Sequence, residues 1–140
     1  MSSSESIYQA VASLVFPKGL LENFEVVKIK ESPIAEDSRQ GVESGEITFY
    51  LEEKDKFSHP EKGHSYRSNG FYEESSVRDF PLRDKKVTLV LRRRRWIDET
   101  SGRSVGNTYD IAAKGTRHSV EFAAFLKETF GHIPDISIFA

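Results

Sequence analysis

Residues 86–97 read KVTLVLRRRRWI, and this stretch decides the fold. Side chains alternate between the two faces of an extended strand, so Val87, Leu89 and Leu91 fall on one face. Apolar residues at every second position are typical of a strand with one buried side. The stretch therefore predicts a strand that packs one face against the rest of the protein.

Four consecutive arginines and the only tryptophan of the chain end this strand. Alternation places Arg92 and Arg94 on the face of Trp96, and it places Arg93 and Arg95 on the opposite face. Exposed guanidinium groups bind phosphates, and an indole can stack on a base. The alternative is an edge strand whose charges prevent aggregation, with Trp96 in the core.

The first half of the chain predicts a helix followed by a β-hairpin. Apolar residues recur at helical spacing after Ser4, a candidate N-cap, until a proline and a glycine end the pattern. Residues 24–30 and 46–52 are rich in β-branched and aromatic side chains, which predicts two paired strands. The polar residues 31–45 between them predict a long hairpin loop.

The middle of the chain predicts a loop and a second hairpin. Residues 53–70 contain almost no apolar side chains and predict a surface loop, whose end Phe71–Tyr72 anchors against the body. Residues 76–81 lead through a turn into the strand at 86–97. Residues 107–111 are expected to return beside that strand as an antiparallel partner.

The last predicted element is a helix, with Ser119 as its N-cap and Gly131 as its end. Residues 132–140 form a partly apolar tail. The sequence as a whole predicts an α+β fold, with a small antiparallel sheet of two hairpins between an N-terminal and a C-terminal helix.

Charge is distributed unevenly along this single predicted domain, 1–140. Residues 1–76 hold 8 Lys and Arg against 14 Asp and Glu, whereas residues 77–140 hold 12 against 8. The chain thus divides into an acidic helix-plus-hairpin half, 5–76, and a basic hairpin-plus-helix half, 77–131. This asymmetry fits a half that binds a polyanion, and it equally fits two halves that attract each other.

Several function classes lack support in the sequence. The chain has no cysteine, and no apolar run approaches the roughly 18 residues that span a bilayer. The N-terminus carries no secretory signal, which suggests a cytoplasmic protein without membrane contact. No phosphate-binding glycine loop or nucleophile motif is present, so we expect neither an enzyme nor a cofactor.

Metal sites also have weak support. His59 and His64 lie five residues apart in a polar segment, without the spacing of a zinc motif, and we expect no metal site. The acidic pairs are interpreted as solvated faces or element ends. These pairs are Glu36–Asp37, Glu52–Glu53 and Glu73–Glu74.

Residues 112–119 provide a second candidate for anion binding. Thr116, Ser119 and the free N–H groups at the start of the last helix could hold a phosphate, while Lys114 and Arg117 add positive charge. His118 is a weaker candidate for contact with a base or sugar. The alternative is ordinary helix capping with solvated charges.

From about residue 16 to residue 131, the chain resembles the N-terminal region of ISAon-type insertion-sequence transposases. The matching stretches are FPKGLLENFEVV at 16–27, RDFPLR at 78–83, RRRRW at 92–96, AKGTR at 113–117 and EFAAFLKE at 121–128. The resemblance implies a DNA-binding protein whose catalytic DDE region is encoded by a separate reading frame.

A larger, related transposase family shows a more distant likeness. Its members carry a short motif similar to residues 77–81 of this chain, followed by a strand and then by a cysteine-bearing zinc ribbon. Here residues 77–81, 87–96 and 98–102 are similar, but the cysteines are absent. The likeness implies a zinc-ribbon-like hairpin that lacks its metal ligands.

These observations predict DNA binding at the terminal repeats of the element, with the catalytic subunit as a partner and homo-oligomers also allowed. A protein-interaction module that docks on the catalytic subunit, or a regulator of transposition, are the alternatives. The candidate DNA-binding residues are Lys85, Lys86, Arg92, Arg93, Arg94, Arg95, Trp96, Lys114, Thr116, Arg117 and His118.

Overall fold

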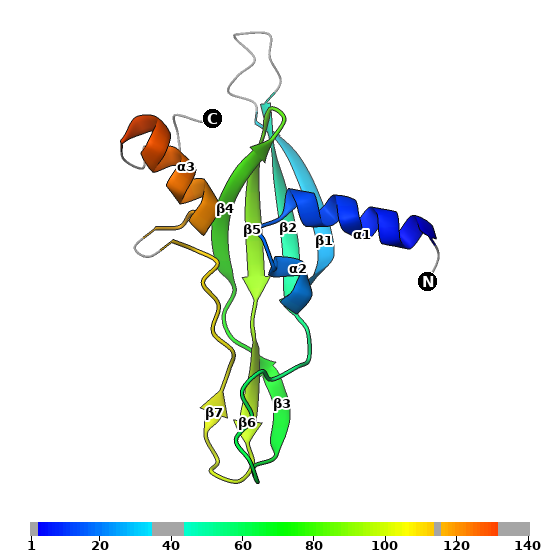
Figure 1. The fold of residues 1–140 in the computed structure, drawn as a ribbon, viewed down its shortest axis with the longest axis vertical. Helices are drawn as coiled ribbons and strands as arrows, with labels where there is room; N and C mark the ends of the chain where they lie inside the picture. Colours follow the sequence, from blue (N-terminus) through cyan, green and yellow to red (C-terminus); the bar gives the residue numbers. More distant parts are fainter. Residues whose placement is uncertain (1–2, 35–43, 114–115, 132–140) are drawn as a thin grey trace.

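The computed structural model describes residues 3–34, 44–113 and 116–131. These residues form two β-sheets that follow one another along the long axis, with the helices beside the upper sheet (Figure 1). The α+β class is therefore confirmed. The elements in chain order are α1 (Ser3–Val15), α2 (Leu20–Asn23), β1 (Phe24–Ile34), β2 (Ser44–Glu53), β3 (Tyr66–Phe71), β4 (Ser75–Leu82), β5 (Lys85–Arg92), β6 (Arg94–Asp98), β7 (Ser104–Val105) and α3 (Val120–Phe130).

The upper sheet has four strands in the order β1-β2-β5-β4. The predicted hairpin of β1 and β2 is confirmed, and β4 and β5 form a further antiparallel pair. The sheet is mixed rather than wholly antiparallel, because β2 and β5 pair in parallel. Their register sets Phe49 beside Leu89 and Leu51 beside Leu91, which aligns the apolar faces of the two strands.

The long strand predicted over 86–97 is two strands in two sheets. β5 ends at Arg92 and β6 begins at Arg94, so the chain leaves the upper sheet at Arg93 and enters a lower sheet of order β3-β6-β7. Residues 53–70 are not only a loop, because β3 begins at Tyr66. The polar side chains of this segment gave no pattern that indicates a strand. The strand is held by backbone pairing with β6.

The return strand after the turn is also shorter than predicted. β7 covers only Ser104–Val105, which pair with Ile97 and Trp96. Residues 107–111 are not a strand in the structure. Polar side chains hold part of this segment instead, since the amide of Asn107 donates to the side chain of Glu53, 2.6 Å away, and to the carbonyl of Lys56.

The main core lies between the apolar face of the upper sheet and the α1–α2 segment. Burying one large apolar side chain contributes roughly 1.5–3 kcal/mol, and the alternate residues of β5 supply three of them. The buried members are Phe16, Leu20, Phe24, Phe49, Leu51, Val77, Val87, Leu89 and Leu91. The predicted burial of Val87, Leu89 and Leu91 on one face of β5 is confirmed, but Thr88 on the opposite face is buried as well.

α1 reaches this core only near its C-terminal end. Ala12 and Val15 pack against the core, and Phe16 just beyond the helix belongs to it. The rest of the helix projects from the body of the molecule (Figure 1). Its large apolar side chains are exposed; these are Ile7, Tyr8, Val11 and Leu14.

α3 has the predicted ends. The hydroxyl of Ser119 accepts the N–H of Phe122, and Gly131 closes the helix with φ 75°, a left-handed conformation that glycine adopts at low cost. Phe122 and Leu126 are buried. No helix in the described part of the chain is long and apolar enough to span a membrane. The tail 132–140 lies outside the described residues.

Candidate functional site

The arginine run lies where the two sheets meet, and two aromatic rings organise it. The guanidinium carbon of Arg92 lies 4.1 Å from the ring centroid of Phe71, and that of Arg94 lies 4.9 Å from the same ring. Arg92 and Arg94 therefore lie together, as predicted, whereas Trp96, which was predicted on the same face, packs against Phe57. Cations over ring faces at partly exposed sites gain about 0.5–1 kcal/mol each.

The other two arginines use the next ring along the chain. Arg93 lies 5.4 Å and Arg95 lies 6.0 Å from the ring centroid of Tyr72. The N–H of Tyr72 donates to the carbonyl of Arg93 at 2.8 Å, which fixes the ring against the run. Phe71 and Tyr72 therefore anchor the end of the predicted loop by holding the arginines in two pairs.

The four arginines differ in the groups that neutralise them. Arg92 forms an ion pair with Glu52, with an N–O distance of 2.8 Å. The Nε of Arg94 donates to the carbonyl of Glu53, and the Nε of Arg95 donates to the carbonyl of Asn69. Within the described ranges, Arg93, Arg94 and Arg95 form no ion pair. Their side chains are oriented while their charges remain available.

Glu53 connects the arginine run to the rest of the protein. Its carboxylate is only 1% exposed and accepts the N–H of Arg94 at 2.8 Å, the amide of Asn107 and the hydroxyl of Tyr109. Burial, and then the contact with Glu53, raise the pKa of the Tyr109 hydroxyl, which stays a donor. The interpretation of Glu52–Glu53 as a solvated face is wrong for Glu53, because three donors replace the water around its carboxylate.

Trp96 is 3% exposed and packs against Phe57, with ring centroids 5.5 Å apart. Its Nε1–H donates to Asp55 at 3.1 Å. The structure therefore supports the core interpretation of this residue, since the ring offers no open face on which a base could stack.

Lys85 and Lys86 lie at the start of β5, whereas Arg92 is its last residue. Arg92 lies six positions after Lys86 along the strand, a distance of roughly 20 Å. Lys85 lies 3.8 Å from Asp84, and Lys86 is paired in the sheet register with Glu46. The structure does not bring these lysines together with the arginines.

The start of α3 is occupied by the chain's own side chains. The hydroxyl of Ser119 accepts the N–H of Phe122 and donates to the buried carboxylate of Asp79 at 2.7 Å. Burial is the main cause that raises the pKa of Asp79. The hydroxyl of Thr116 donates to the carbonyl of Ala113. This arrangement is the helix cap that was the alternative to a phosphate site.

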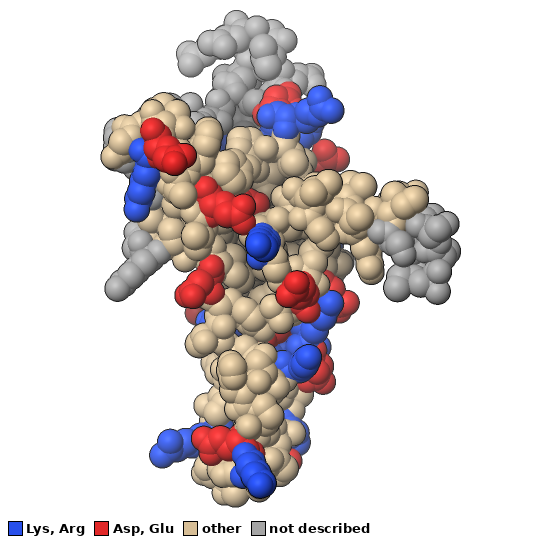
Figure 2. All heavy atoms as spheres, in the orientation of Figure 1, with Lys and Arg blue, Asp and Glu red and all other residues tan. Residues whose placement is uncertain are grey.

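Of the other candidates near α3, Arg117 is exposed and its carbonyl accepts the N–H of Arg78 at 2.6 Å. Lys114 lies outside the described residues. Positive and negative side chains alternate over the face of the molecule shown in Figure 2, and among its coloured residues neither sign gathers there. Among the described residues of the segment 112–119, Arg117 is the exposed cation.

His118 is buried beside the ring of Phe122, and neither of its ring nitrogens has a hydrogen-bond partner among the residues described. Burial, and then the charge of Arg78, lower its pKa below 6.5. A lowered folded-state pKa means that the unfolded chain takes up the proton first, so this contribution to stability is present above pH 6.5 and is lost as the pH falls through the lowered pKa.

We expect the free energy of unfolding of the wild-type protein to decrease relative to that of His118→Leu between about pH 7 and about pH 5. Urea unfolding of both proteins at each pH measures this difference, which removes the contributions that they share. A difference that stays constant over this range would contradict the assignment.

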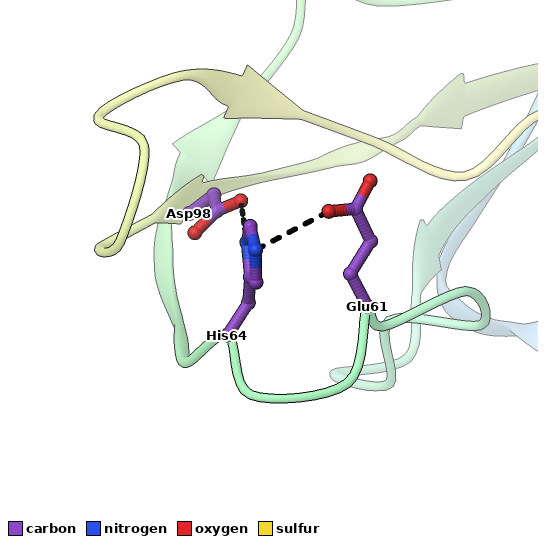
Figure 3. A group of neighbouring side chains, drawn as sticks. All are labelled: Glu61, His64 and Asp98. Atoms are coloured by element: carbon purple, nitrogen blue, oxygen red, sulfur yellow. Dashed lines mark hydrogen bonds and ion pairs between the residues drawn. The ribbon is translucent and has the colours of Figure 1, made fainter.

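One further cluster was missed by the sequence analysis. Glu61, His64 and Asp98 bring their donor atoms within 4.8 Å of one another (Figure 3). The bond to Asp98 is the main cause that raises the pKa of His64. Burial would raise the pKa of Asp98, but its bonds to His64, Thr100 and Ser101 together lower it. The spacing Glu61-x-x-His64 was visible in the sequence, whereas the pairing of β3 with β6 that adds Asp98 was not.

No family model matches the chain, and no curated protein or solved structure matches it at a significant level.

Proposed function

We propose that this chain is the DNA-binding N-terminal region, or accessory subunit, of an insertion-sequence transposase, and that it acts in the cytoplasm on the terminal repeats of the element. One observation carries this proposal. Arg93 and Arg95 share the ring of Tyr72 and have no carboxylate partner among the described residues. The ordered sequence resemblance over most of the chain supports it.

Oriented guanidinium groups suit the binding of a phosphate backbone. A planar guanidinium donates two parallel hydrogen bonds to a phosphate, and an arginine already stacked on a ring loses less entropy when it binds. Arg92 is less suited, because Glu52 neutralises it. The proposed main contacts are therefore Arg93 and Arg95, followed by Arg94 and Arg117.

The proposed role is not enzymatic. The catalytic DDE subunit would supply the chemistry of strand transfer, and this chain would bring it to the element ends. A regulator of transposition would use the same DNA-binding surface. A DDE transposase encoded in the neighbouring reading frame would support the role of an active transposase subunit over that of a regulator.

Fluorescence anisotropy with labelled duplexes tests the proposal. We expect tighter binding to a duplex that ends in the terminal repeat than to a scrambled duplex of equal length. Arg93→Gln/Arg95→Gln should weaken binding at least tenfold, since each charged contact to phosphate is worth about 1 kcal/mol or more.

The matched control is Lys28→Gln/Lys30→Gln, which removes two charges at the same spacing from β1, a strand at the edge of the upper sheet. This control should bind like the wild type. Equal losses in the two double variants would mean that only net charge matters, and they would contradict the assigned contacts.

The second candidate function is docking on the catalytic subunit, and the exposed apolar row of α1 favours it. Exposed apolar side chains in a row are typical of a surface that a partner helix covers. Ile7→Ser/Val11→Ser should then abolish capture of the catalytic subunit and leave DNA binding unchanged. If the Ile7→Ser/Val11→Ser variant still captured the catalytic subunit, α1 would not be its docking surface.

A further inference from the structure

The lower sheet holds a cluster that the proposed function does not use. The Nδ1 of His64 lies 2.6 Å from the Oδ2 of Asp98, and its Nε2 lies 3.4 Å from the Oε2 of Glu61 (Figure 3). The imidazole thus stands between two carboxylates that differ in their surroundings. Asp98 is buried, whereas Glu61 is 72% exposed.

Asp98 is fixed in place. Its Oδ1 accepts the N–H groups of Thr100 and Ser101 at 2.9 and 3.3 Å, which leaves Oδ2 to face His64. A carboxylate in this position holds the Nδ1–H form of a neutral imidazole. This form directs the lone pair of Nε2 toward Glu61. A metal-binding histidine is commonly oriented in this way, by a carboxylate that accepts the N–H of its other ring nitrogen.

The turn between Glu61 and His64 is also fixed. The N–H of His64 donates to the carbonyl of Glu61 at 3.1 Å, and the N–H of Glu61 donates to the hydroxyl of Tyr66 at 2.8 Å. Gly63 adopts φ 82°, which a residue with a side chain rarely adopts. The backbone therefore positions the two side chains before any ligand arrives.

The separation of the two donor atoms fits a shared metal ion. At 3.4 Å, the Nε2–Oε2 distance exceeds the range of about 2.7–3.2 Å that is usual for N–H···O bonds. Two ligands at about 2.0–2.1 Å from one tetrahedral ion lie about 3.3 Å apart. The observed spacing is close to that value.

We propose that Glu61 and His64 bind one divalent transition-metal ion of the zinc class through Oε2 and Nε2, with Asp98 as a positioning residue. Water would complete the coordination, as it does in open zinc sites. An imidazole beside a carboxylate favours zinc over magnesium, which prefers oxygen ligands only.

Isothermal titration calorimetry of the full chain with zinc chloride at about pH 8, where the ligands are deprotonated, tests this proposal. We expect one equivalent of zinc to bind, and magnesium chloride to give no signal. His64→Gln should abolish binding and Glu61→Gln should weaken it at least tenfold. His59→Gln is the matched control, because His59 is exposed in the same segment and lies outside the cluster.

Asp98→Asn tests the positioning role. An asparagine that keeps the bonds to Thr100 and Ser101 can only donate to Nδ1, so it reverses the tautomer of His64. We expect zinc binding to weaken about 10- to 100-fold. Nitrogen NMR of the imidazole ring should show Nδ1–H in the wild type and Nε2–H in the variant.

Two outcomes in the variants would overturn the proposal. One is unchanged zinc binding in Glu61→Gln, whose exposed side chain can be replaced without unfolding the protein. The other is loss of binding in His59→Gln. Absence of zinc binding to the folded wild-type chain would overturn it as well.

Discussion

Glu53→Ala is expected to destabilise the protein by about 3–4 kcal/mol, which is a large part of the stability of a domain of this size. The change removes the acceptor for the N–H of Arg94 and for the hydroxyl of Tyr109, and it removes one of the acceptors of the Asn107 amide. Each buried donor left without a partner costs about 1–3 kcal/mol. Urea unfolding followed by circular dichroism measures the loss.

Glu52→Ala is the matched control, since it removes the same side chain one position earlier on β2. Glu52 pairs with Arg92 at a partly exposed site, and such pairs are worth at most about 1 kcal/mol. A loss in Glu53→Ala no larger than that in Glu52→Ala would show that the buried carboxylate does not hold the two sheets together.

Trp96→Ala is expected to cost about 3–5 kcal/mol, as is usual when a buried indole is truncated. The indole packs against Phe57, which also contacts Tyr66, and these three rings form an apolar cluster at the lower sheet. We expect β3 and β6 to lose protection first, because Tyr66 belongs to β3 and Trp96 to β6. Amide hydrogen exchange measured by mass spectrometry reports this loss strand by strand.

Trp96→Phe provides the control. It keeps most of the packing and removes only the bond from Nε1 to Asp55, so we expect a cost of about 1 kcal/mol. It should also bind DNA like the wild type. Strong loss of DNA affinity in a folded Trp96→Phe would mean that the indole contacts a base, against its burial in the structure.

The sequence was informative about periodicity and local signals. Alternation predicted the buried face of β5 and the pairing of the four arginines into two sets, because both depend on strand geometry alone. Ser119 and Gly131 predicted the ends of α3, because capping depends on neighbouring residues.

Partners distant in the sequence could not be predicted in the same way. The parallel pairing of β2 with β5 depends on how the chain returns from the lower sheet, and no local pattern encodes it. β3 was missed because its side chains are mostly polar. The burial of Glu53 depends on Asn107 and Tyr109, which lie more than 50 positions later.

The two halves of opposite charge are also explained in part by the structure. Arg78 pairs with Glu46 and Arg92 pairs with Glu52, so basic residues of the second half lie against acidic residues of the first. This supports the interpretation in which the halves attract each other. Only arginines without such partners remain available for a polyanion. For this reason, not all four arginines of the run are proposed as main contacts.

The salt dependence of DNA binding tests the central claim most directly. If about four phosphates are neutralised, the logarithm of the association constant should fall against that of the salt concentration with a slope of roughly −3 to −4. Arg93→Gln/Arg95→Gln should make the slope shallower by about 2, while Lys28→Gln/Lys30→Gln should leave it unchanged. Binding that does not depend on salt, or the same slope in the arginine variant as in the wild type, would contradict a role of these two arginines in holding DNA.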